Sequence, residues 1–544
     1  MRPSSSPSSS SSSSSSDTGS QSDSTLAAHM SLLSLDDDNE DIEELAATPI
    51  FTQPVLRYGS TLEVDGTVEP FTQYGLLAGI IEGSRSINYR SKVTANERLY
   101  FNTTAPSSIF ICGSQGSGKS HTLGCLLENC LMQSEANVLP RPLTGIVFHY
   151  DHWVSASRGS PCEAAYLASA EDVSVRVLCP PTNVKQIQRI YSRLPDVQVE
   201  VLRINQSDLN TKRMMDLMAV SSVQGGMPLY LHVVQRILRD LRIEQQTAQT
   251  TFNYREFKKR LMDEPLTPAQ LQPLQQRLET LESFMVKEQV VLASNKRAIQ
   301  SQGKGTDWKP KPGQLTIIDL SCPCVTEETA CSLFNICLSL FLEQSPEVGR
   351  VVALDEAHKY MTETAECEVL TEALLSNIRL QRHLGLRVMI STQEPTISPK
   401  LLDLCSVTIV HRFTSPDWLQ SLKKHLAGAS IAPMTKDQLL SNGDDKVDSI
   451  ASPDPNDLAR ELFSKIVALR RGEALLFSPS AIIDVRTTTI KSENGSPRKN
   501  GWHDAEEPAL EEAVPQLIKL SHGHMKIRVR KRVTQDGGRS ILAV

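Results

Sequence analysis

The stretch "SSIFICGSQGSGKSHTLGCLLENCL", residues 107–131, constrains the fold more than any other part of the chain. It contains the pattern G-x-x-x-x-G-K-[ST], preceded by an apolar run and followed by an amphipathic helical pattern. Glycines let the loop backbone curl so that its N–H groups surround phosphates, and the helix N-terminus adds its positive dipole. In this arrangement Lys119 reaches the β- and γ-phosphates and Ser120 binds Mg²⁺. A glycine turn without a ligand would rarely be flanked by both a strand and a helix.

The motif therefore predicts a nucleotide site made by consecutive residues, with ATP and Mg²⁺ as the expected cofactors. GTP is less favoured, because "SNKRA" at 294–298 lacks the aspartate that would recognise guanine. The candidate nucleotide-binding residues are Gly113, Ser114, Gln115, Gly116, Ser117, Gly118, Lys119, Ser120 and His121.

Short apolar runs alternate with longer amphipathic stretches through most of the chain. The runs include "SSIFICG", "TGIVFHYD", "VSVRVLC", "VQVEVLRI", "QLTIIDLS", "RVVALDE", "LRVMISTQ", "VTIVHRF" and "EALLFSP". Continuous apolar runs of this length are typical of strands buried on both faces of a parallel sheet. The pattern predicts an α/β core with a mostly parallel sheet.

A pair of carboxylates follows the apolar run "VVAL". Asp355 is expected to hold Mg²⁺, and Glu356 to orient or deprotonate the attacking water. The alternative is that the pair only caps the next helix. Asp151 and Asp319 also end apparent strands, but helix capping is the favoured role for both of them.

Four further polar residues are candidates for contact with the nucleotide. "RVMISTQEP" ends a strand at Gln393, which can contact the γ-phosphate or the water, although it can equally be an ordinary polar strand end. Arg379 and Arg382 lie just before that strand, and either could supply charge to a neighbouring copy's nucleotide or belong to the helix surface. Arg412, which ends "TIVHR", is a third arginine candidate.

The letters DEAH at 355–358 suggest a helicase, but the rest of the sequence does not. The phosphate-loop residue Lys119 and the DEAH residue Asp355 lie in different halves of the chain. In DEAH helicases these two motifs are separated by a much shorter stretch of sequence. A second RecA-like domain with its glutamine-arginine-glycine motif is also missing after residue 358. The DEAH letters are therefore not helicase-specific here.

Several segments, in this order, resemble HerA/FtsK-type P-loop ATPases. They are the phosphate loop, a large insertion, "GQLTIIDLS", "VVALDEAHKYM", "LGLRVMISTQEPTISPKLLDLCSVTIVHRF" and "GEALLFSPSA", and they span roughly residues 100–485. The serine-rich start and "GSQGSGKSHTL" are similar to uncharacterised fungal ATPases of this group. The N-terminal barrel typical of HerA and the winged helix of FtsK are not found.

The resemblance implies a RecA-like core with an additional strand. It implies that Lys119 and Ser120 bind nucleotide and Mg²⁺, that Asp355 and Glu356 are the metal-binding and catalytic acids, and that Gln393 is the polar sensor. It also implies a homo-oligomer, with a hexamer as the candidate size, in which Arg379 or Arg382 acts on a neighbour. DNA is the implied polymer.

Composition changes along the chain predict its division. Residues 206–312 have helical apolar spacing and end in a Gly/Pro/Lys linker, so they are expected to be a helical insertion. The predicted parts are a disordered Ser-rich and acidic tail (1–47), a small β-rich region (48–104), the phosphate-loop half of the core (105–205), the insertion (206–312), the second half of the core (313–491), a loop (492–515) and a basic strand or tail (516–544). In the β-rich region, "VLRYGSTLEVDG" and "YGLLAGIIEG" are expected to be strands. In the second half of the core, residues 434–457 are expected to be a surface loop.

Composition also bounds the setting of the protein. The 11 cysteines form no paired zinc pattern, which favours free thiols in a reducing compartment. No apolar stretch is long enough for a spanning helix, and the N-terminus lacks a signal-peptide pattern. We therefore expect an intracellular protein of the cytoplasm or nucleus that has no membrane contact.

Charge is distributed unevenly, although the net charge is only −7. The acidic N-terminal tail is a candidate site for protein partners. In the basic tail, Lys526, Arg528, Arg530 and Arg532 would share one face of a strand, with apolar residues facing inward. The favoured interpretation is an edge strand docked on the core, and the alternatives are a phosphate-tracking face for nucleic acid and a nuclear-import signal.

The sequence is compatible with two functions. One is an oligomeric ATP-driven motor acting on DNA or another polymer. The other is an ATP-dependent switch or scaffold that does not translocate nucleic acid. A nucleotide-binding module without catalysis is disfavoured, because Lys119, Ser120, Asp355 and Glu356 are all present.

Overall fold

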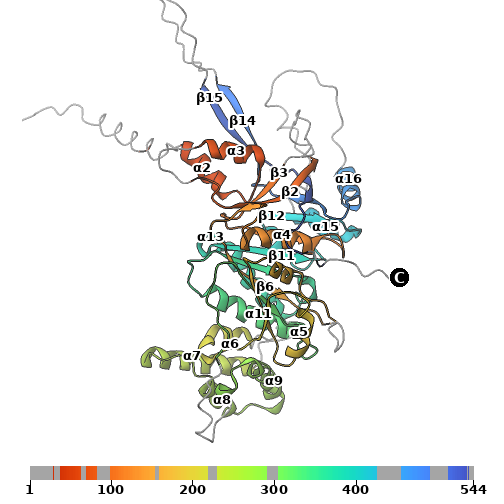
Figure 1. Cartoon of the computed structure of the whole chain (residues 1–544). Helices are drawn as coiled ribbons and strands as arrows, with labels where there is room; N and C mark the ends of the chain where they lie inside the picture. The colour runs from red at the N-terminus through yellow and green to blue at the C-terminus, as the bar shows by residue number, and fades with distance from the viewer. Residues whose placement is uncertain are drawn as a thin grey trace, which may run out of the picture.

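A single large sheet forms the centre of the molecule, with strand order β15-β14-β1-β3-β2-β16-β13-β12-β4-β11-β10-β6-β9-β7-β8 (Figure 1). The computed structural model describes residues 29, 37–62, 69–82, 98–152, 159–217, 229–290, 304–425, 455–490, 512–535 and 537. The Ser-rich start and most of the loops predicted at 434–457 and 492–515 lie outside the described residues.

Eight strands make up the parallel half of the sheet. They are β12 (Val407–His411), β4 (Ser108–Cys112), β11 (Leu386–Thr392), β10 (Arg350–Leu354), β6 (Thr144–His149), β9 (Gln314–Asp319), β7 (Ser174–Cys179) and β8 (Val197–Val201). β11 lies between β4, which leads into the phosphate loop, and β10, which leads into the carboxylate pair. This additional strand between the two motif strands is the arrangement of a RecA-like P-loop core, so the predicted fold class is confirmed.

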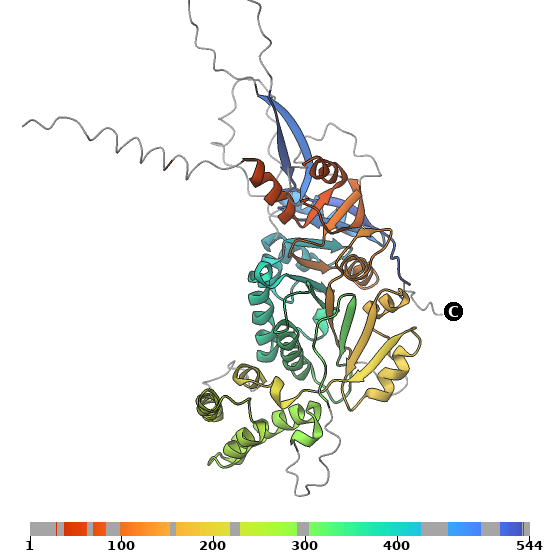
Figure 2. The same ribbon diagram turned by 60° about the vertical axis from the view of Figure 1, so that its left-hand side comes forward.

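The strands of this half are apolar throughout because alternate side chains pack against helices on opposite faces. In β10, Val352 and Leu354 join the core on one face, while Val351 and Ala353 join the core on the other. Figure 2 shows the two helical layers on either side of the sheet. One layer contains α11 (Glu327–Leu342), α12 (Ala365–Arg379), α14 (Pro399–Leu404) and α15 (Pro416–His425), and the other contains α4 (Lys119–Leu131), η1 (Glu163–Ser169) and α5 (Val184–Tyr191).

The other half of the sheet is mainly antiparallel and continues from β12. Its strands are β13 (Glu473–Phe477), β16 (Met525–Val529), β2 (Tyr74–Glu82), β3 (Arg98–Asn102), β1 (Ile50–Thr52), β14 (Ile482–Ile490) and β15 (Glu512–Lys519), and β5 (Asn137–Val138) pairs with β2. β16 has the predicted alternation, with Ile527 buried and Arg528 exposed. It pairs with β13 on one side and β2 on the other, so the prediction of an edge strand is wrong.

Two expectations for the N-terminal region are corrected by the structure. "VLRYG" belongs to helix α3 (Gln53–Thr61), not to a strand, because a proline starts the helix and Val55 and Gly59 bury one of its faces. The acidic segment expected to be disordered forms helix α2 (Asp37–Ala47), where Leu45 is buried in a small cluster with Phe51. The few apolar residues of this segment are enough to pack helix α2 against the cluster around Phe51.

Helices fill the described part of the insertion, at the bottom of Figure 1. They are α6 (Thr211–Leu217), α7 (Leu229–Ala248), α8 (Tyr254–Met262), α9 (Pro268–Phe284) and α10 (Lys287–Val290), and η2 (Gln206–Asp208) precedes them. α9 begins with a capping box between Thr267 and Gln270, and its apolar face buries Leu274 and Leu281. Among the helices that the structure describes, none combines the length and the apolar character required to span a membrane.

Candidate nucleotide-binding site

The loop from Gly113 to Gly118 has a positive φ at three positions, Gly113, Gly116 and Gly118, a backbone that only glycine adopts easily. Gly113 has a φ of 148°, and a Cβ atom there would lie 2.7 Å from the Cβ of His411. Gly118 has a φ of 119° at the start of α4, and its added Cβ would lie 3.3 Å from the backbone N of Gly472. The motif glycines are therefore required by conformation and by close approach.

Neighbouring strands support the loop from outside. The N–H and hydroxyl of Ser114 donate to the carbonyl oxygen of Arg412, at the end of β12. The N–H of Gly472, in the turn between α16 (Pro455–Val467) and β13, donates to the carbonyl oxygen of Ser117 at 3.3 Å. The sequence interpretation missed this turn, although its residues "RRG" (470–472) are a recognisable signal for a basic loop.

Lys119 is enclosed at the start of α4, with only 3% of its side chain exposed. Its Nζ donates to the carbonyl oxygen of Ser114 at 3.3 Å and lies 4.0 Å from Oε1 of Glu356. Burial lowers the pKa of Lys119, while the carboxylates of Glu356 and Asp355 oppose this shift. The ammonium group is thus held between the loop and the acidic pair.

Asp355 is buried directly after β10, and its two carboxylate oxygens differ in their hydrogen bonds to the described residues. Its Oδ2 lies 3.2 Å from Nδ1 of His149 and accepts a hydrogen bond from Sγ of Cys162 at 3.5 Å. Its Oδ1 is buried without a hydrogen-bond partner among the described residues. Burial alone would raise the pKa of Asp355, but its partners, His149 first, hold the pKa below the ordinary value.

Glu356 and Gln393 are brought together at the ends of β10 and β11. Glu356 has left-handed backbone angles, φ 49° and ψ 45°, which are unusual for a residue with a side chain. Nε2 of Gln393 donates to Oε2 of Glu356 at 3.0 Å, and Nδ1 of His358 lies 3.4 Å from the same oxygen. His358 lies in η4 (Ala357–Lys359), and its place in the site was not predicted from the sequence.

The remaining predicted residues lie around the site or away from it. Ser120 is half-buried in the first turn of α4, and Gln115 and Gly116 are exposed in the loop. Nε2 of His121 lies 2.8 Å from the carbonyl oxygen of Arg530, so its ring is engaged by the C-terminal segment.

The predicted arginines differ in their placement. Arg379, at the end of α12, and Arg382, in α13 (Gln381–Leu384), are exposed and precede β11. They therefore lie at the edge of the sheet opposite the phosphate loop of the same chain. Arg412 is exposed beside the loop, at the same edge as Lys119.

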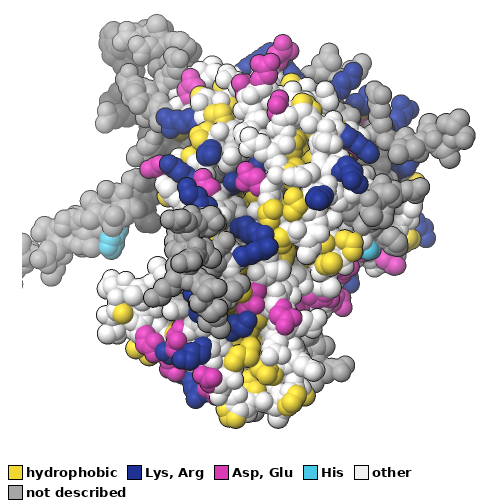
Figure 3. Space-filling model, turned by 60° about the horizontal axis from the view of Figure 1, so that its bottom comes forward, with side chains coloured by type: hydrophobic (Ala, Val, Ile, Leu, Met, Phe, Trp, Pro, Cys, Tyr) yellow, Lys and Arg dark blue, Asp and Glu magenta, His cyan; other side chains and the backbone are white. Residues whose placement is uncertain are grey.

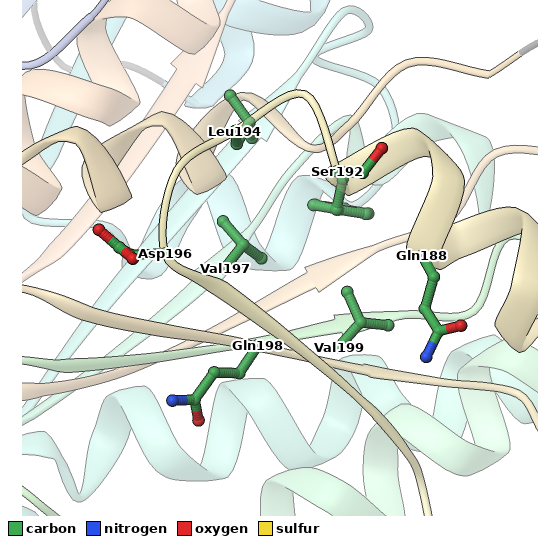
Figure 4. A pocket seen from close by; sticks show the side chains of 8 residues that line it. Gln188, Ser192, Leu194, Asp196, Val197, Gln198 and Val199 are labelled. Carbon is green, nitrogen blue, oxygen red and sulfur yellow. The ribbon is translucent and has the colours of Figure 1, made fainter.

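The residues present fit a magnesium–nucleotide complex. The hydroxyl of Ser117 and Oδ1 of Asp355 are both buried without hydrogen-bond partners among the described residues, on the loop and beside it. Buried polar atoms of this kind need a partner, and oxygen ligands are those that Mg²⁺ prefers. A separate pocket of about 420 Å³ lies between α5 and β8, at the far edge of the sheet (Figure 4). Its side chains do not include the predicted site residues; they are Gln188, Tyr191, Ser192, Leu194, Asp196, Val197, Gln198 and Val199.

Comparison with known proteins gives matches in structure only. No family model matches the sequence, and no curated protein matches it. VirB4 of Thermoanaerobacter pseudethanolicus is similar at 12% identity and a TM-score of 0.35, covering 76% of this chain and 94% of VirB4. The DNA-packaging ATPase B204 of Sulfolobus turreted icosahedral virus is similar at 11% identity and a TM-score of 0.26, covering 69% and 93%.

The resemblance to HerA/FtsK-type P-loop ATPases lies in the sequence motifs around Lys119, Asp355 and Gln393. A third match is the cytoplasmic domain of the Thermomonospora curvata type VII secretion ATPase EccC, at 12% identity and a TM-score of 0.27. It covers 87% of this chain but 30% of the EccC chain.

Proposed function

We propose that the protein binds ATP with Mg²⁺ at the phosphate loop and hydrolyses it. The observation that carries this proposal is the convergence of Lys119, Asp355, Glu356 and Gln393 beside the loop, from α4, β10 and β11. Ammonium, metal-binding carboxylate, catalytic carboxylate and amide are the groups that phosphoryl transfer to water requires.

Each residue has a distinct role in this proposal. The loop N–H groups and Lys119 bind the β- and γ-phosphates, and Ser120 and Asp355 hold Mg²⁺, which neutralises charge on the phosphates when bound. Glu356 accepts a proton from the attacking water, and Gln393, already hydrogen-bonded to Glu356, orients that water. Lys119 exchanges its contact with Glu356 for the phosphates, which leaves the carboxylate available to the water.

We further propose that hydrolysis drives movement of DNA by a homo-oligomer. The exposed positions of Arg379 and Arg382 support this proposal, because both can reach a neighbouring copy more readily than the nucleotide of their own chain. A hexamer is the size that the family resemblance favours.

A second candidate is an ATP-dependent switch that does not move nucleic acid. Two observations favour it. Arg530 and Arg532, for which a phosphate-tracking face was the alternative interpretation, are paired with the buried Glu128. The face drawn in Figure 3 has Lys and Arg side chains interspersed with Asp and Glu, not arranged as one basic track among the described residues.

One experiment separates the two candidates. ATP turnover of the purified full chain is measured with and without double-stranded DNA, alongside its mass under native conditions. A motor shows turnover that DNA stimulates and a mass of several chains. Turnover that is indifferent to DNA supports the switch, and the absence of Mg²⁺-dependent turnover contradicts the ATPase assignment itself.

A further inference from the structure

Three potential metal ligands meet beneath the nucleotide site. His149 is the last residue of β6, Cys162 lies just before η1, and Asp355 follows β10. Their ligand atoms lie within 4.8 Å of one another, and all three residues are buried. Only Asp355 belongs to the ATPase machinery described above.

Two of the three distances between these atoms match those around a tetrahedral zinc ion. With Zn–N and Zn–O bonds of about 2.0–2.1 Å and a Zn–S bond of about 2.3 Å, a tetrahedral site puts N and O about 3.3 Å apart and S and O about 3.5 Å apart. The observed separations are 3.2 Å from His149 Nδ1 to Asp355 Oδ2 and 3.5 Å from Cys162 Sγ to the same oxygen. The third pair, the ligand atoms of His149 and Cys162, lies within 4.8 Å, so the three atoms are close enough to surround one ion.

The chemistry of the donor set also favours zinc over magnesium. Imidazole nitrogen and thiolate sulfur are ligands of Zn²⁺, whereas Mg²⁺ takes oxygen ligands in octahedral geometry. Mg²⁺ with ATP would use Oδ1 of Asp355, which has no hydrogen-bond partner among the described residues, while the other two ligands face Oδ2. One carboxylate thus lies between an oxygen site and a mixed nitrogen–sulfur site.

We propose that His149, Cys162 and Asp355 form a Zn²⁺ site, and that bound Zn²⁺ inhibits the ATPase because it shares the Asp355 carboxylate with Mg²⁺. Two divalent cations held by one carboxylate repel each other, so Zn²⁺ at Oδ2 weakens Mg²⁺ at Oδ1. Zinc binding releases two protons to solvent, the thiol proton of Cys162 and the proton that Nδ1 of His149 donates to Asp355, and it involves no oxidation. The inhibitory part rests on the proposed ATPase function, but the binding site does not.

Binding is tested first, without reference to ATP hydrolysis. The full chain, stripped of metal with a chelator, is titrated with Co²⁺ as a spectroscopic substitute, and then with Zn²⁺ by calorimetry. We expect a thiolate-to-cobalt absorption band that Zn²⁺ removes. Cys162→Ser should lose the band and weaken Zn²⁺ binding by about tenfold or more, whereas the matched control Cys324→Ser, at an exposed cysteine, should retain both.

Inhibition is tested second, on the same proteins. Low Zn²⁺ concentrations should suppress Mg²⁺-dependent turnover of the wild type, and the Cys162→Ser variant should resist this while keeping its basal turnover within about twofold. A wild type without the cobalt band, or a variant that keeps it, overturns the site and leaves only a hydrogen-bonded triad around Asp355. Zinc binding that leaves turnover unchanged overturns the inhibitory role. If turnover is absent altogether, the ATPase proposal fails while the cobalt titration still decides the site.

Discussion

The ammonium group of Lys119 lies between a loop carbonyl and the Glu356 carboxylate. We expect Lys119→Ala to weaken ATP binding by about 10- to 100-fold, since a hydrogen bond from a charged donor contributes about 1.5–3 kcal/mol. Titration with a fluorescent ATP analogue measures the effect. The exposed Lys309→Ala is the matched control. An unchanged affinity of Lys119→Ala for ATP would show that the phosphate loop does not bind the nucleotide.

Glu356 has a different predicted effect, because it acts on water and not on the nucleotide. Glu356→Gln keeps the size and the contact to Gln393 but removes the proton acceptor. We expect ATP binding near the wild-type level and hydrolysis slower by about 10²- to 10⁴-fold. Binding and single-turnover measurements on the same sample check this, with the exposed Glu363→Gln as control. A wild-type rate of ATP turnover in Glu356→Gln would show that another residue is the base.

His411 behind the phosphate loop predicts a dependence of stability on pH. Nδ1 of His411 donates to the carbonyl oxygen of Glu473, which leaves Nε2 to accept from Thr122, and burial lowers the pKa of His411 to about 4. The unfolded state binds a proton below pH about 6.5 while the folded state does not, so stability falls as pH drops from about 6.5 to about 4, by about 3 kcal/mol. Urea unfolding at pH 7 and pH 4.5 should show a smaller loss for His411→Gln. Equal losses in both proteins would contradict the buried neutral histidine.

At the scale of elements, the segment after β16 is fixed to α4 by a buried carboxylate. Glu128 is fully buried and accepts hydrogen bonds from Arg530 at 2.7 Å and from the N–H and hydroxyl groups of Thr534. Burial would raise the pKa of Glu128, but Thr534 and Arg530 outweigh it, so the carboxylate is charged. The tail arginines thus stabilise the core on the helix that begins with Lys119.

Glu128→Gln should therefore destabilise the protein by about 3–5 kcal/mol, because it leaves buried arginines without their counter-charge. The exposed pair of Lys400 and Glu372 provides the matched control, and Glu372→Gln should have a much smaller effect because solvent screens this pair. Chemical denaturation of both variants gives the comparison. Equal effects would show that the buried pair contributes no more than a surface pair.

Elements with strong local patterns could be predicted from the sequence. The apolar runs ending at Cys112, Leu354 and Thr392 are strands, and the loop before Lys119 has the expected form. Long-range pairing could not be predicted: nothing in the residues of β16 indicates that both of its edges are covered. The cluster at Cys162 was equally hidden, because it depends on which loops meet below the site.

At the scale of the whole molecule, the arginines before β11 predict a shared active site. If Arg379 or Arg382 acts on a neighbour's nucleotide, mixing an arginine variant with Glu356→Gln should restore part of the ATP turnover. Hybrid interfaces then combine an intact carboxylate with an intact arginine. Turnover is measured across mixing ratios, and a strictly additive loss would contradict a shared site.

The interior position of β16 has a consequence for synthesis. β2 and β13 are joined only through β16 in the strand order, and β16 follows β2 by most of the chain. At the usual rate of about 5–20 residues per second, β2 leaves the ribosome tens of seconds before its partner. During that interval an unpaired strand edge is exposed, and such edges pair readily with other chains. Chains growing side by side on one messenger RNA therefore present matching open edges to each other until β16 has also left the ribosome.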